Sequence, residues 1–393
     1  MKKLLLIIIA AMILSDGLFA LDAPQISIQN LRQKGMGGVR LSVLDDQYSI
    51  MNNPAGPAKK EKKWVSIIQA QATVSGDFFD LFDNREKIIN AATGDHDIDN
   101  ETWNFLSRFK LSVGTTPLYI TLLNILPLGF NLAIFDSLNV RAKANPDVPI
   151  PTLDFLAYND TAAVLNFSTE IGRYLGLNKD MFALYVGANA KLIHRIQLGR
   201  ENMDIFYLVN LGGGNFSELD VRRALAFGMD IGATLALFEN RALALSLTLN
   251  DFFRTKFSWI KPASLNSVGD ILGEGEDTGK AYINPSLCIG AAWKVGTILP
   301  WVMEGLILSA DIRDIFDYDI VPFLKIYAGF EFALLKVLRI RGGIYQGYLC
   351  GGVGIDIPIL PLEIDAAYWG EELGRYPGSQ RLDNFGVTLN IVF

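Results

Sequence analysis

Few residues of this chain have the chemistry of an enzyme active site. The sequence contains two histidines, His96 and His194, and no Gly-x-Ser-x-Gly motif that would hold a serine nucleophile in a tight turn. His96 lies between two aspartates in a polar stretch, and His194 falls on the apolar side of a predicted strand. Because neither histidine has an identifiable acid or base partner, we expect that the protein is not an enzyme.

Four basic side chains could instead bind an anionic group. They occupy inward-facing positions of predicted strands and are Lys191, Arg195, Arg339 and Arg341. A charge enclosed in a protein needs a partner. That partner is either the carboxylate head group of a ligand or a carboxylate of a segment packed inside the strands, and we favour the second.

The stretch GMGGVRLSVLDDQYSIMNNPAG, residues 35–56, has the composition of a tightly packed segment. Its glycines Gly35, Gly37 and Gly38 permit close backbone approach. Its last residues predict a turn, because an asparagine side chain can bond its own backbone and proline has a fixed φ. The residues of this turn are Asn53, Pro54, Ala55 and Gly56.

Asp45 and Asp46, in the middle of the same stretch, could ligate a calcium ion. Two adjacent carboxylates do not make a calcium site without further oxygen ligands at alternating positions, and the stretch has no such pattern. It also lacks the Gly-x-x-x-x-Gly-Lys-Ser/Thr spacing of a nucleotide-binding loop. We therefore predict a hydrogen-bonding or solvated role for both aspartates, and no metal or cofactor.

The chain begins with the pattern of a secretion signal. Residues 1–20 combine a short basic start, an apolar run too short to span a bilayer and a small residue, Ala20, suited to cleavage. The net charge of −7 gives no reason to expect a nucleic-acid partner. Cys288 and Cys350 are interpreted as packing residues, although they could pair if their strands bring them together.

The composition points to a membrane protein that crosses with strands. Half of the residues are hydrophobic, yet no apolar run of about 20 residues follows the signal. Many segments instead alternate, as in 182–197, 225–236 and 384–393, with one apolar row and one small or polar row. We predict that Leu184, Leu247 and Ile289 face lipid, whereas Gly187, Thr248 and Gly290 face the lumen.

The alternation predicts an all-β fold, a fourteen-stranded antiparallel transmembrane β-barrel. The predicted strands are 63–74, 106–125, 128–140, 157–174, 182–197, 223–236, 242–253, 283–295, 305–313, 323–333, 338–346, 351–358, 362–370 and 384–393. With this count, every link longer than ten residues falls on one side, as such barrels require. Any single alternating strand could also belong to a large soluble sheet with one buried face. The repetition of the pattern in fourteen strands favours the barrel. Pro117 predicts a bulge or a short helix in the second strand.

Residues 21–62 precede the first strand and have no place in the wall. A barrel of fourteen strands encloses a lumen too wide for its own side chains to fill. We therefore assign 21–62 as an N-terminal plug inside the lumen and 63–393 as the barrel. The terminal Phe393, with apolar residues at every second position before it, is interpreted as a signal for barrel-assembly machinery.

The order Gly35-Met-Gly-Gly-Val, Asp45-Asp46 and Asn53-Pro54-Ala55-Gly56 after a signal peptide resembles the plug signature of the FadL family of outer-membrane long-chain fatty-acid transporters. The last third of the chain, from Leu324 to Phe393, is similar to uncharacterised spirochaetal members and to PorV proteins of type IX secretion. The resemblance implies a plugged fourteen-stranded barrel in the outer membrane of a diderm bacterium, with surface-exposed loops. It also implies lateral release of a hydrophobic ligand such as a long-chain fatty acid.

Three other classes of function stay open at this point. A PorV-like secretion accessory or surface antigen would not transport, and a general porin would show a charged, water-filled constriction. An outer-membrane hydrolase is the least favoured, because its acid and base cannot be named. As partners we expect a hydrophobic ligand, outer-membrane lipid and assembly machinery, with no nucleic acid, and the barrel as a monomer.

Overall fold

The computed structural model describes most of the chain. The described residues are 21–22, 30–43, 48–59, 64–87, 90, 100–126, 129–145, 152–172, 181–204, 219–262, 273–297, 299, 302–357, 362–374 and 376–392. The helices are α2 (Leu31–Gly35), α3 (Ser49–Asn52), η1 (Gly56–Lys59), α4 (Asp77–Asp83), α6 (Asn100–Arg108), η2 (Glu239–Arg241) and η3 (Pro322–Lys325). Residues 1–20, the predicted signal peptide, lie outside the described part.

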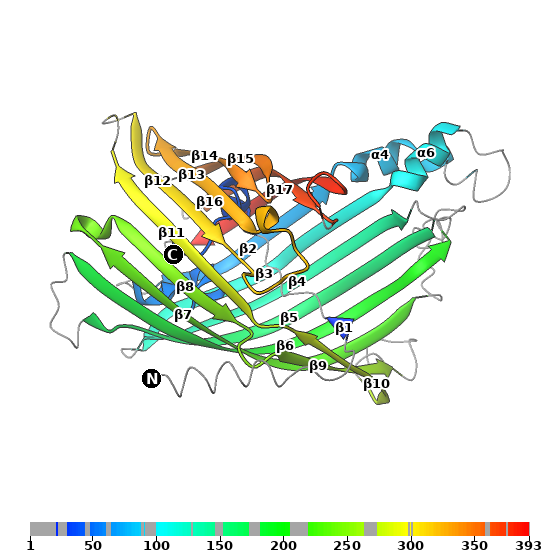
Figure 1. Cartoon of the computed structure of the whole chain (residues 1–393), viewed down its shortest axis with the longest axis horizontal. Coiled ribbons are helices and arrows are strands. Elements are labelled where there is room, and N and C mark those ends of the chain that lie inside the picture. The colour runs from blue at the N-terminus through cyan, green and yellow to red at the C-terminus, as the bar shows by residue number, and fades with distance from the viewer. Residues whose placement is uncertain are drawn as a thin grey trace.

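Long antiparallel strands make up the wall (Figure 1). They are β2 (Trp64–Ser75), β3 (Lys110–Leu126), β4 (Phe130–Asn145), β5 (Thr152–Glu170), β6 (Phe182–Asp204), β7 (Asp220–Leu237), β8 (Leu243–Asn250), β9 (Thr255–Pro262), β10 (Gly275–Ile283), β11 (Ser286–Gly296), β12 (Met303–Ile312), β13 (Ile326–Leu334), β14 (Leu338–Tyr345), β15 (Tyr348–Ile357), β16 (Leu362–Glu372) and β17 (Arg381–Val392). A two-residue strand, β1 (Leu21–Asp22), pairs in parallel with β10.

The barrel closes where β17 pairs with β2, from Asn384 opposite Ser75 to Val392 opposite Ser66. β8 and β9 both pair with β7, so they form one interrupted wall strand. β10 and β11 do the same, because β10 pairs with β9 and β11 with β8. With these two pairs counted once and β1 left out, the wall has the predicted fourteen strands.

We call the end where β2 begins and β17 ends the terminal end, and the opposite end the loop end. α4 and α6 lie beyond the loop end (Figure 1). Several predicted boundaries are wrong. The predicted strands 106–125 and 323–333 begin within α6 and η3, respectively. The predicted loop 254–282 contains β9 and β10, and β5 ends at Glu170, so a link longer than ten residues, 171–181, falls at the terminal end. The predicted irregularity at Pro117 is confirmed by a register shift between Thr115 and Leu118.

The two faces of the wall differ in polarity as the alternation predicts. Leu247 and Ile289 are 48% and 40% exposed on the outer face, whereas Thr248 is fully buried on the inner face. On β7, Leu225 and Phe227 are likewise exposed on the outer face. Among the described helices, none is long and apolar enough to cross a bilayer.

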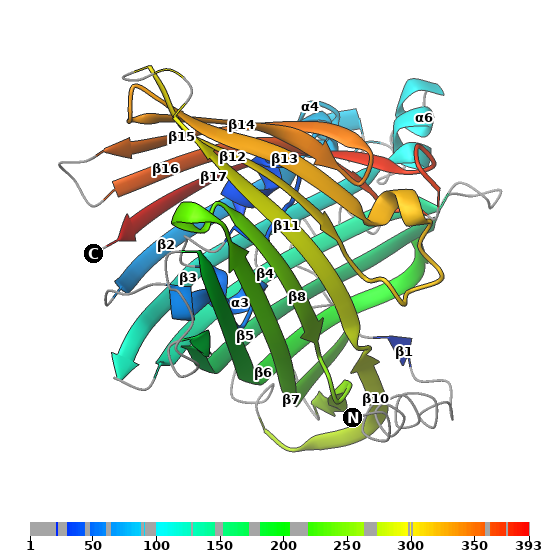
Figure 2. The same ribbon diagram turned by 60° about the vertical axis from the view of Figure 1, so that its left-hand side comes forward.

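Residues 30–43 and 48–59, named here the inner segment, lie within the ring of strands (Figure 2). α2 packs against β14 to β17, and η1 packs against β3, β5 and β6. The apolar side chains Leu31, Met36 and Ile50 of the inner segment are almost completely buried. The inner segment therefore crosses the lumen and contacts opposite sides of the wall.

Candidate functional site

The sequence 53–56 forms the predicted turn. The amide of Gly56 donates to the carbonyl of Asn53 at 2.8 Å, which closes a four-residue turn. Asn53 Oδ1 accepts from the amide of Ala55 at 3.0 Å, the local bond for which asparagine is suited. Asn53 Nδ2 donates to the carbonyl of Leu41 and to Thr234 Oγ1 of β7, each at 2.9 Å. One buried side chain thus holds the turn, the rest of the inner segment and the wall together.

Two wall glycines make room for this turn. Gly187 of β6 and Gly232 of β7 lie directly opposite each other in the ladder. A β-carbon on Gly187 would lie 1.9 Å from the carbonyl oxygen of Pro54, and one on Gly232 would lie 2.4 Å from Asn53 Oδ1. The small inward residues that the sequence shows here are therefore the contact surface for the turn.

The glycines of the inner segment make a second close contact, with β13 to β15. A β-carbon on Gly35 would lie 2.9 Å from the Cα of Gly352. Gly37 and Gly38 have φ of +75° and +80°, which side chains disfavour, and the amide of Gly37 donates to Cys350 Sγ at 3.1 Å. Cys288 and Cys350 are both free thiols. The packing role expected for the three glycines is what the geometry shows.

The predicted inward-facing cations pair with the wall rather than with the inner segment. Lys191 Nζ lies 2.6 Å from Asp230 and 2.7 Å from Asp251, a group we call the Lys191 triad. Arg195 forms a two-pronged pair with Asp160 at 2.6 and 2.7 Å.

On the opposite side of the lumen, Arg341 lies 2.6 Å from Glu331 and also pairs with Asp365. Arg339 lies 3.0 Å from Asp356. The plug carboxylates Asp45, Asp46 and Glu61 lie outside the described residues, so their predicted contact with these cations stays a prediction. In the described part of the inner segment it is a cation that pairs with a wall carboxylate, because Arg32 lies 2.7 Å from Glu331.

Sequence reasoning missed these wall carboxylates, although strand register contained the signal. Asp160 lies directly opposite Arg195 in the β5–β6 ladder, and Glu331 lies directly opposite Arg341 in the β13–β14 ladder. Opposite charges at facing positions stabilise strand pairing. A comparison across neighbouring strands, rather than along each strand, would have identified both pairs.

A row of asparagines connects the turn to the Lys191 triad. Asn131, Asn166 and Asn189 lie on β4, β5 and β6, and each of the first two is 2.7 Å from the next. Asn189 Nδ2 lies 3.3 Å from Asp230 of the triad. The same row donates to the inner segment, at the carbonyls of Pro54 (2.9 Å) and Ile50 (2.8 Å). Such connected networks specify one arrangement of the groups they join.

The wall ladder is interrupted beside the Lys191 triad. β7 pairs with β8 from Leu237 to Ile231 and with β9 from Leu225 to Arg223, which leaves 226–230 outside both ladders. Residues 251–254 make the kink between β8 and β9, and the amide of Phe252 donates to the carbonyl of Met229 at 2.8 Å. A hollow of about 40 Å³ lies here. Its lining residues include Phe227 and Phe253, which are 59% and 70% exposed.

The inner face beside this interruption is apolar and aromatic. A buried cluster combines residues of β3 to β7, β9 and β10 with Tyr48 and Ile50 of the inner segment. Ala226 of β7 and Phe257 of β9 belong to it, and each lies two residues from the lining of the hollow, at Gly228 and Thr255. We call this the apolar lumen face. It reaches the wall at the point where the ladder is interrupted.

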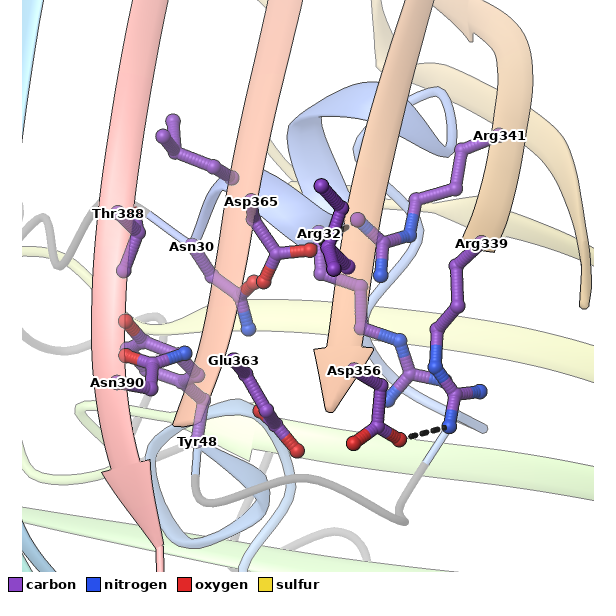
Figure 3. Close-up of a pocket in the computed structure, with 13 residues that line it drawn as sticks. Asn30, Arg32, Tyr48, Arg339, Arg341, Asp356, Glu363, Asp365, Thr388 and Asn390 are labelled. Carbon is purple, nitrogen blue, oxygen red and sulfur yellow. Dashed lines mark hydrogen bonds and ion pairs between the residues drawn. The ribbon is translucent and has the colours of Figure 1, made fainter. Parts of the chain in front are cut away.

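A polar cavity of about 280 Å³ lies on the other side of the inner segment, near the terminal end. Charged side chains line it, and Figure 3 shows those of Arg32, Arg339, Asp356, Glu363 and Asp365 around one space. The lumen thus has the apolar lumen face together with the paired charges of Lys191 and Arg195 on the side of β4 to β10, and the charged cavity on the side of β14 to β17.

Three predicted features lie outside the described residues. These are the aspartates Asp45 and Asp46, the terminal Phe393 and the stretch around His96. His194 lies on β6 opposite Thr161, on the outer side of the wall as predicted. Among the described residues, no group of three or more His, Cys, Asp or Glu side chains could hold a metal ion.

No protein-family model and no curated protein sequence matches the chain. Among solved structures, the Pseudomonas putida toluene transporter TodX is similar with a TM-score of 0.47 and 12% identity, over 95% of this chain and 98% of that one. The Ralstonia pickettii toluene transporter TbuX is similar with a TM-score of 0.46 and 11% identity, over 93% and 97%. The translocator domain of the Neisseria meningitidis autotransporter NalP has a TM-score of 0.37 and 8% identity, over 84% and 87%.

Proposed function

We propose that the protein carries hydrophobic small molecules across the outer membrane of a diderm bacterium. The observation that carries the proposal is the apolar lumen face that ends at an interruption of the wall ladder. A hydrophobic molecule on this face stays out of water, and the outer side of the interruption is flanked by exposed Phe227 and Phe253. Release at this point would be lateral, into the membrane.

The membrane location rests on the outer face of the closed wall. A soluble protein does not expose apolar side chains such as Leu225, Leu247 and Ile289 on every part of a closed sheet. A barrel satisfies all its backbone groups between strands, which a bilayer requires. The terminal end then faces the periplasm and the loop end faces outside.

The finer features implied by the FadL resemblance belong to the same proposal. They are a long-chain fatty acid as ligand and the inner segment as a plug. A plug fits the buried turn 53–56 and the contacts of Arg32 with the opposite wall. A general porin fits less well, because the inner segment occupies the lumen and the wall cations are paired with carboxylates.

Uptake by intact cells tests the proposal. Cells that make the protein should accumulate labelled oleic acid faster than cells with an empty vector, with no gain in the entry of a sugar of similar mass. Ala226→Phe, which adds bulk to the apolar lumen face, should lower this uptake. Ala310→Phe adds the same bulk on the lipid-facing side of β12 and should not.

Equal surface amounts of heat-modifiable barrel must be shown for each variant. Uptake equal to that of the empty vector would reject the carrier and favour a secretion accessory or antigen. A matching gain in sugar entry would favour a porin. Asn53→Ala and Pro54→Ala test the plug, because a loosened plug should impair uptake or admit small hydrophilic solutes.

A further inference from the structure

Three side chains on neighbouring strands form one row of the charged cavity near the terminal end. Asp356 of β15 lies directly opposite Glu363 of β16, and Glu363 lies directly opposite Asn390 of β17. All three line the cavity together with Arg32 and Arg339 (Figure 3). Like charges at facing positions of two strands destabilise their pairing. The two adjacent carboxylates therefore favour a positive group between them.

The charged groups in and around the cavity do not balance. The arginines are Arg32, Arg339 and Arg341, and the carboxylates are Glu331, Asp356, Glu363 and Asp365. Each arginine pairs with a carboxylate other than Glu363. Among the described residues, Glu363 has no ion pair. Three positive and four negative charges leave an excess of one negative charge, and it lies on Glu363.

Asn390, on the other side of Glu363, also has an unused acceptor. It is 2% exposed, and its Oδ1 atom is buried with no hydrogen-bond partner. Figure 3 places the Asn390 amide beside Glu363, and the last torsion of an asparagine side chain turns easily, so this oxygen can be brought to the cavity. A buried acceptor without a donor is costly. A donor bound in the cavity would remove this cost.

The acceptors of this row suit an ammonium group better than a metal ion. Among the described residues, no group of three or more His, Cys, Asp or Glu side chains could hold a metal, and hard cations take six or more oxygen ligands. An alkylammonium has one positive charge and three N–H donors. These match the one excess negative charge and the three acceptor side chains of the row.

From these observations we propose that the charged cavity binds a small primary amine in its ammonium form. The ammonium donates to Glu363, to the Asp356 oxygen that Arg339 does not use, and to Asn390 Oδ1. The alkyl part lies against Leu31 and Ile355, the apolar residues of the lining. A volume of about 280 Å³ has room for such a ligand. The arginines around the rest of the cavity repel a second ammonium, so the ligand is a monoamine.

The ligand reaches this site from the terminal end. Asp356 and Glu363 each lie one residue from the terminal end of their strands. α2 crosses β15 at Gly352, on the loop-end side of the site, because a β-carbon on Gly35 would lie 2.9 Å from the Cα of Gly352. The wall and the inner segment both line the cavity, so a bound amine should also hold α2 in place. Only the naming of this end as periplasmic rests on the proposed function.

Calorimetric titration of the protein in phosphatidylcholine nanodiscs tests this inference, with empty nanodiscs subtracted. The buffer is phosphate at pH 7.5, because neither it nor the lipid contains a primary amine. The probes are butylamine, butanol, 1,4-diaminobutane and magnesium chloride. We expect butylamine to bind about tenfold or more tightly than butanol, because hydrogen bonds to a charged group are worth at least this factor. The diamine should bind no more tightly than butylamine.

Three outcomes of this titration would overturn the proposal. Equal affinity for butylamine and butanol would mean that the charge is not recognised. Tighter binding of the diamine would mean that the arginines do not limit the ligand to one ammonium. Magnesium binding that displaces butylamine would mean a metal site.

One variant and a matched control locate the amine. Glu363→Gln keeps the shape of the side chain and removes its charge, so it should lower butylamine affinity about tenfold and leave butanol affinity unchanged. It should also fold, because it removes a contact between like charges. Glu276→Gln removes a negative charge from the exposed part of β10 and should change neither affinity. Wild-type butylamine affinity in Glu363→Gln would place the amine elsewhere and reject the site.

Hydrogen exchange gives a second readout that a purely structural role of Glu363 would not produce. Butylamine should slow the exchange of peptides from 30–43 in the wild type and not in Glu363→Gln, and equal slowing in both would also reject the site. Neither measurement depends on transport. Butylamine binding in a chain that takes up no oleic acid would reject the carrier function and keep the amine site, whereas uptake of oleic acid without butylamine binding would do the reverse.

Discussion

The carbonyl oxygen of Pro54 lies so close to Gly187 that a β-carbon at position 187 would be only 1.9 Å from it. Asn166 Nδ2 donates to the same oxygen at 2.9 Å. The turn of the inner segment is therefore fitted to a glycine and held by a wall side chain. The first two predictions test whether this contact keeps the inner segment in place.

Gly187→Ala should displace the turn from the wall. The new β-carbon meets backbone atoms of Pro54 and Ala55, which cannot rotate away as a side chain would. Hydrogen exchange of peptides from 48–59 should become at least several-fold faster, while the barrel keeps its heat-modifiable migration. Gly351→Ala is the matched control, because the nearest atom to its β-carbon is 3.7 Å away. Equal protection in both variants would contradict the contact.

Asn53→Ala should loosen the inner segment without unfolding the wall. The change removes two donors and one acceptor, and leaves the Leu41 carbonyl and the Ala55 amide unsatisfied in a buried place. Each such loss costs about 1–3 kcal/mol. Asn53→Asp keeps the acceptor for Ala55 but places a second oxygen against the Leu41 carbonyl oxygen, so it should loosen the inner segment as well. The measurement is protease access to 30–59, and an unchanged cleavage rate in Asn53→Ala would argue against the role of this side chain.

Leu247→Arg should destabilise the folded barrel because Leu247 faces lipid. An arginine on the lipid face costs up to about 2–4 kcal/mol near the bilayer midplane. The comparison is reversible urea unfolding in vesicles, with Leu247→Met as control. A lipid-confined spin label should quench a fluorophore at position 247 more strongly than one at 248. The opposite order would mean that the register is shifted by one residue.

Docking of α2 should depend on pH through Lys34. Burial lowers the pKa of Lys34 to about 8 from its usual 10.5, with Arg313 and Arg141 acting in the same direction and Glu371 against it. The docked state thus prefers the neutral amine. Docking of α2 should become more favourable as pH increases from about 8 to 10.5. Below pH 8 it should not depend on this group, because Lys34 is then protonated in both states.

Wild type and Lys34→Met should be compared at each pH by hydrogen exchange of peptides from 30–43. The ratio of their rates removes the intrinsic effect of pH on exchange. Relative protection of the wild type should increase between pH 8 and 10. A ratio independent of pH would show that Lys34 does not change protonation on docking.

The alternation of apolar and polar residues along each strand made the wall predictable from the sequence. The pairing of the inward-facing charges was not, because it depends on the register between neighbouring strands. In 225–236 every second residue is apolar, so the strand and its lipid face follow from the sequence. β10 was missed because residues 275–280 are exposed and need no apolar row. The turn at 53–56 was predictable from local chemistry alone. Its contact with Gly187 and Gly232 was not, because it depends on how the inner segment crosses the lumen.

Lys191→Met should weaken the wall at its interruption. Lys191 neutralises Asp230 and Asp251, and all three side chains are less than 10% exposed. Removing the cation leaves two carboxylates facing each other, and breaking a buried ion pair in this way costs about 3–5 kcal/mol. Adding Asp251→Asn to Lys191→Met removes one of the two unpaired carboxylates and should recover part of the lost stability. The amides of 226–230 should exchange faster in the single variant than in the double variant, while those of β15 and β16 should not change. If the single variant leaves 226–230 as protected as in the wild type, the triad does not hold the interruption closed.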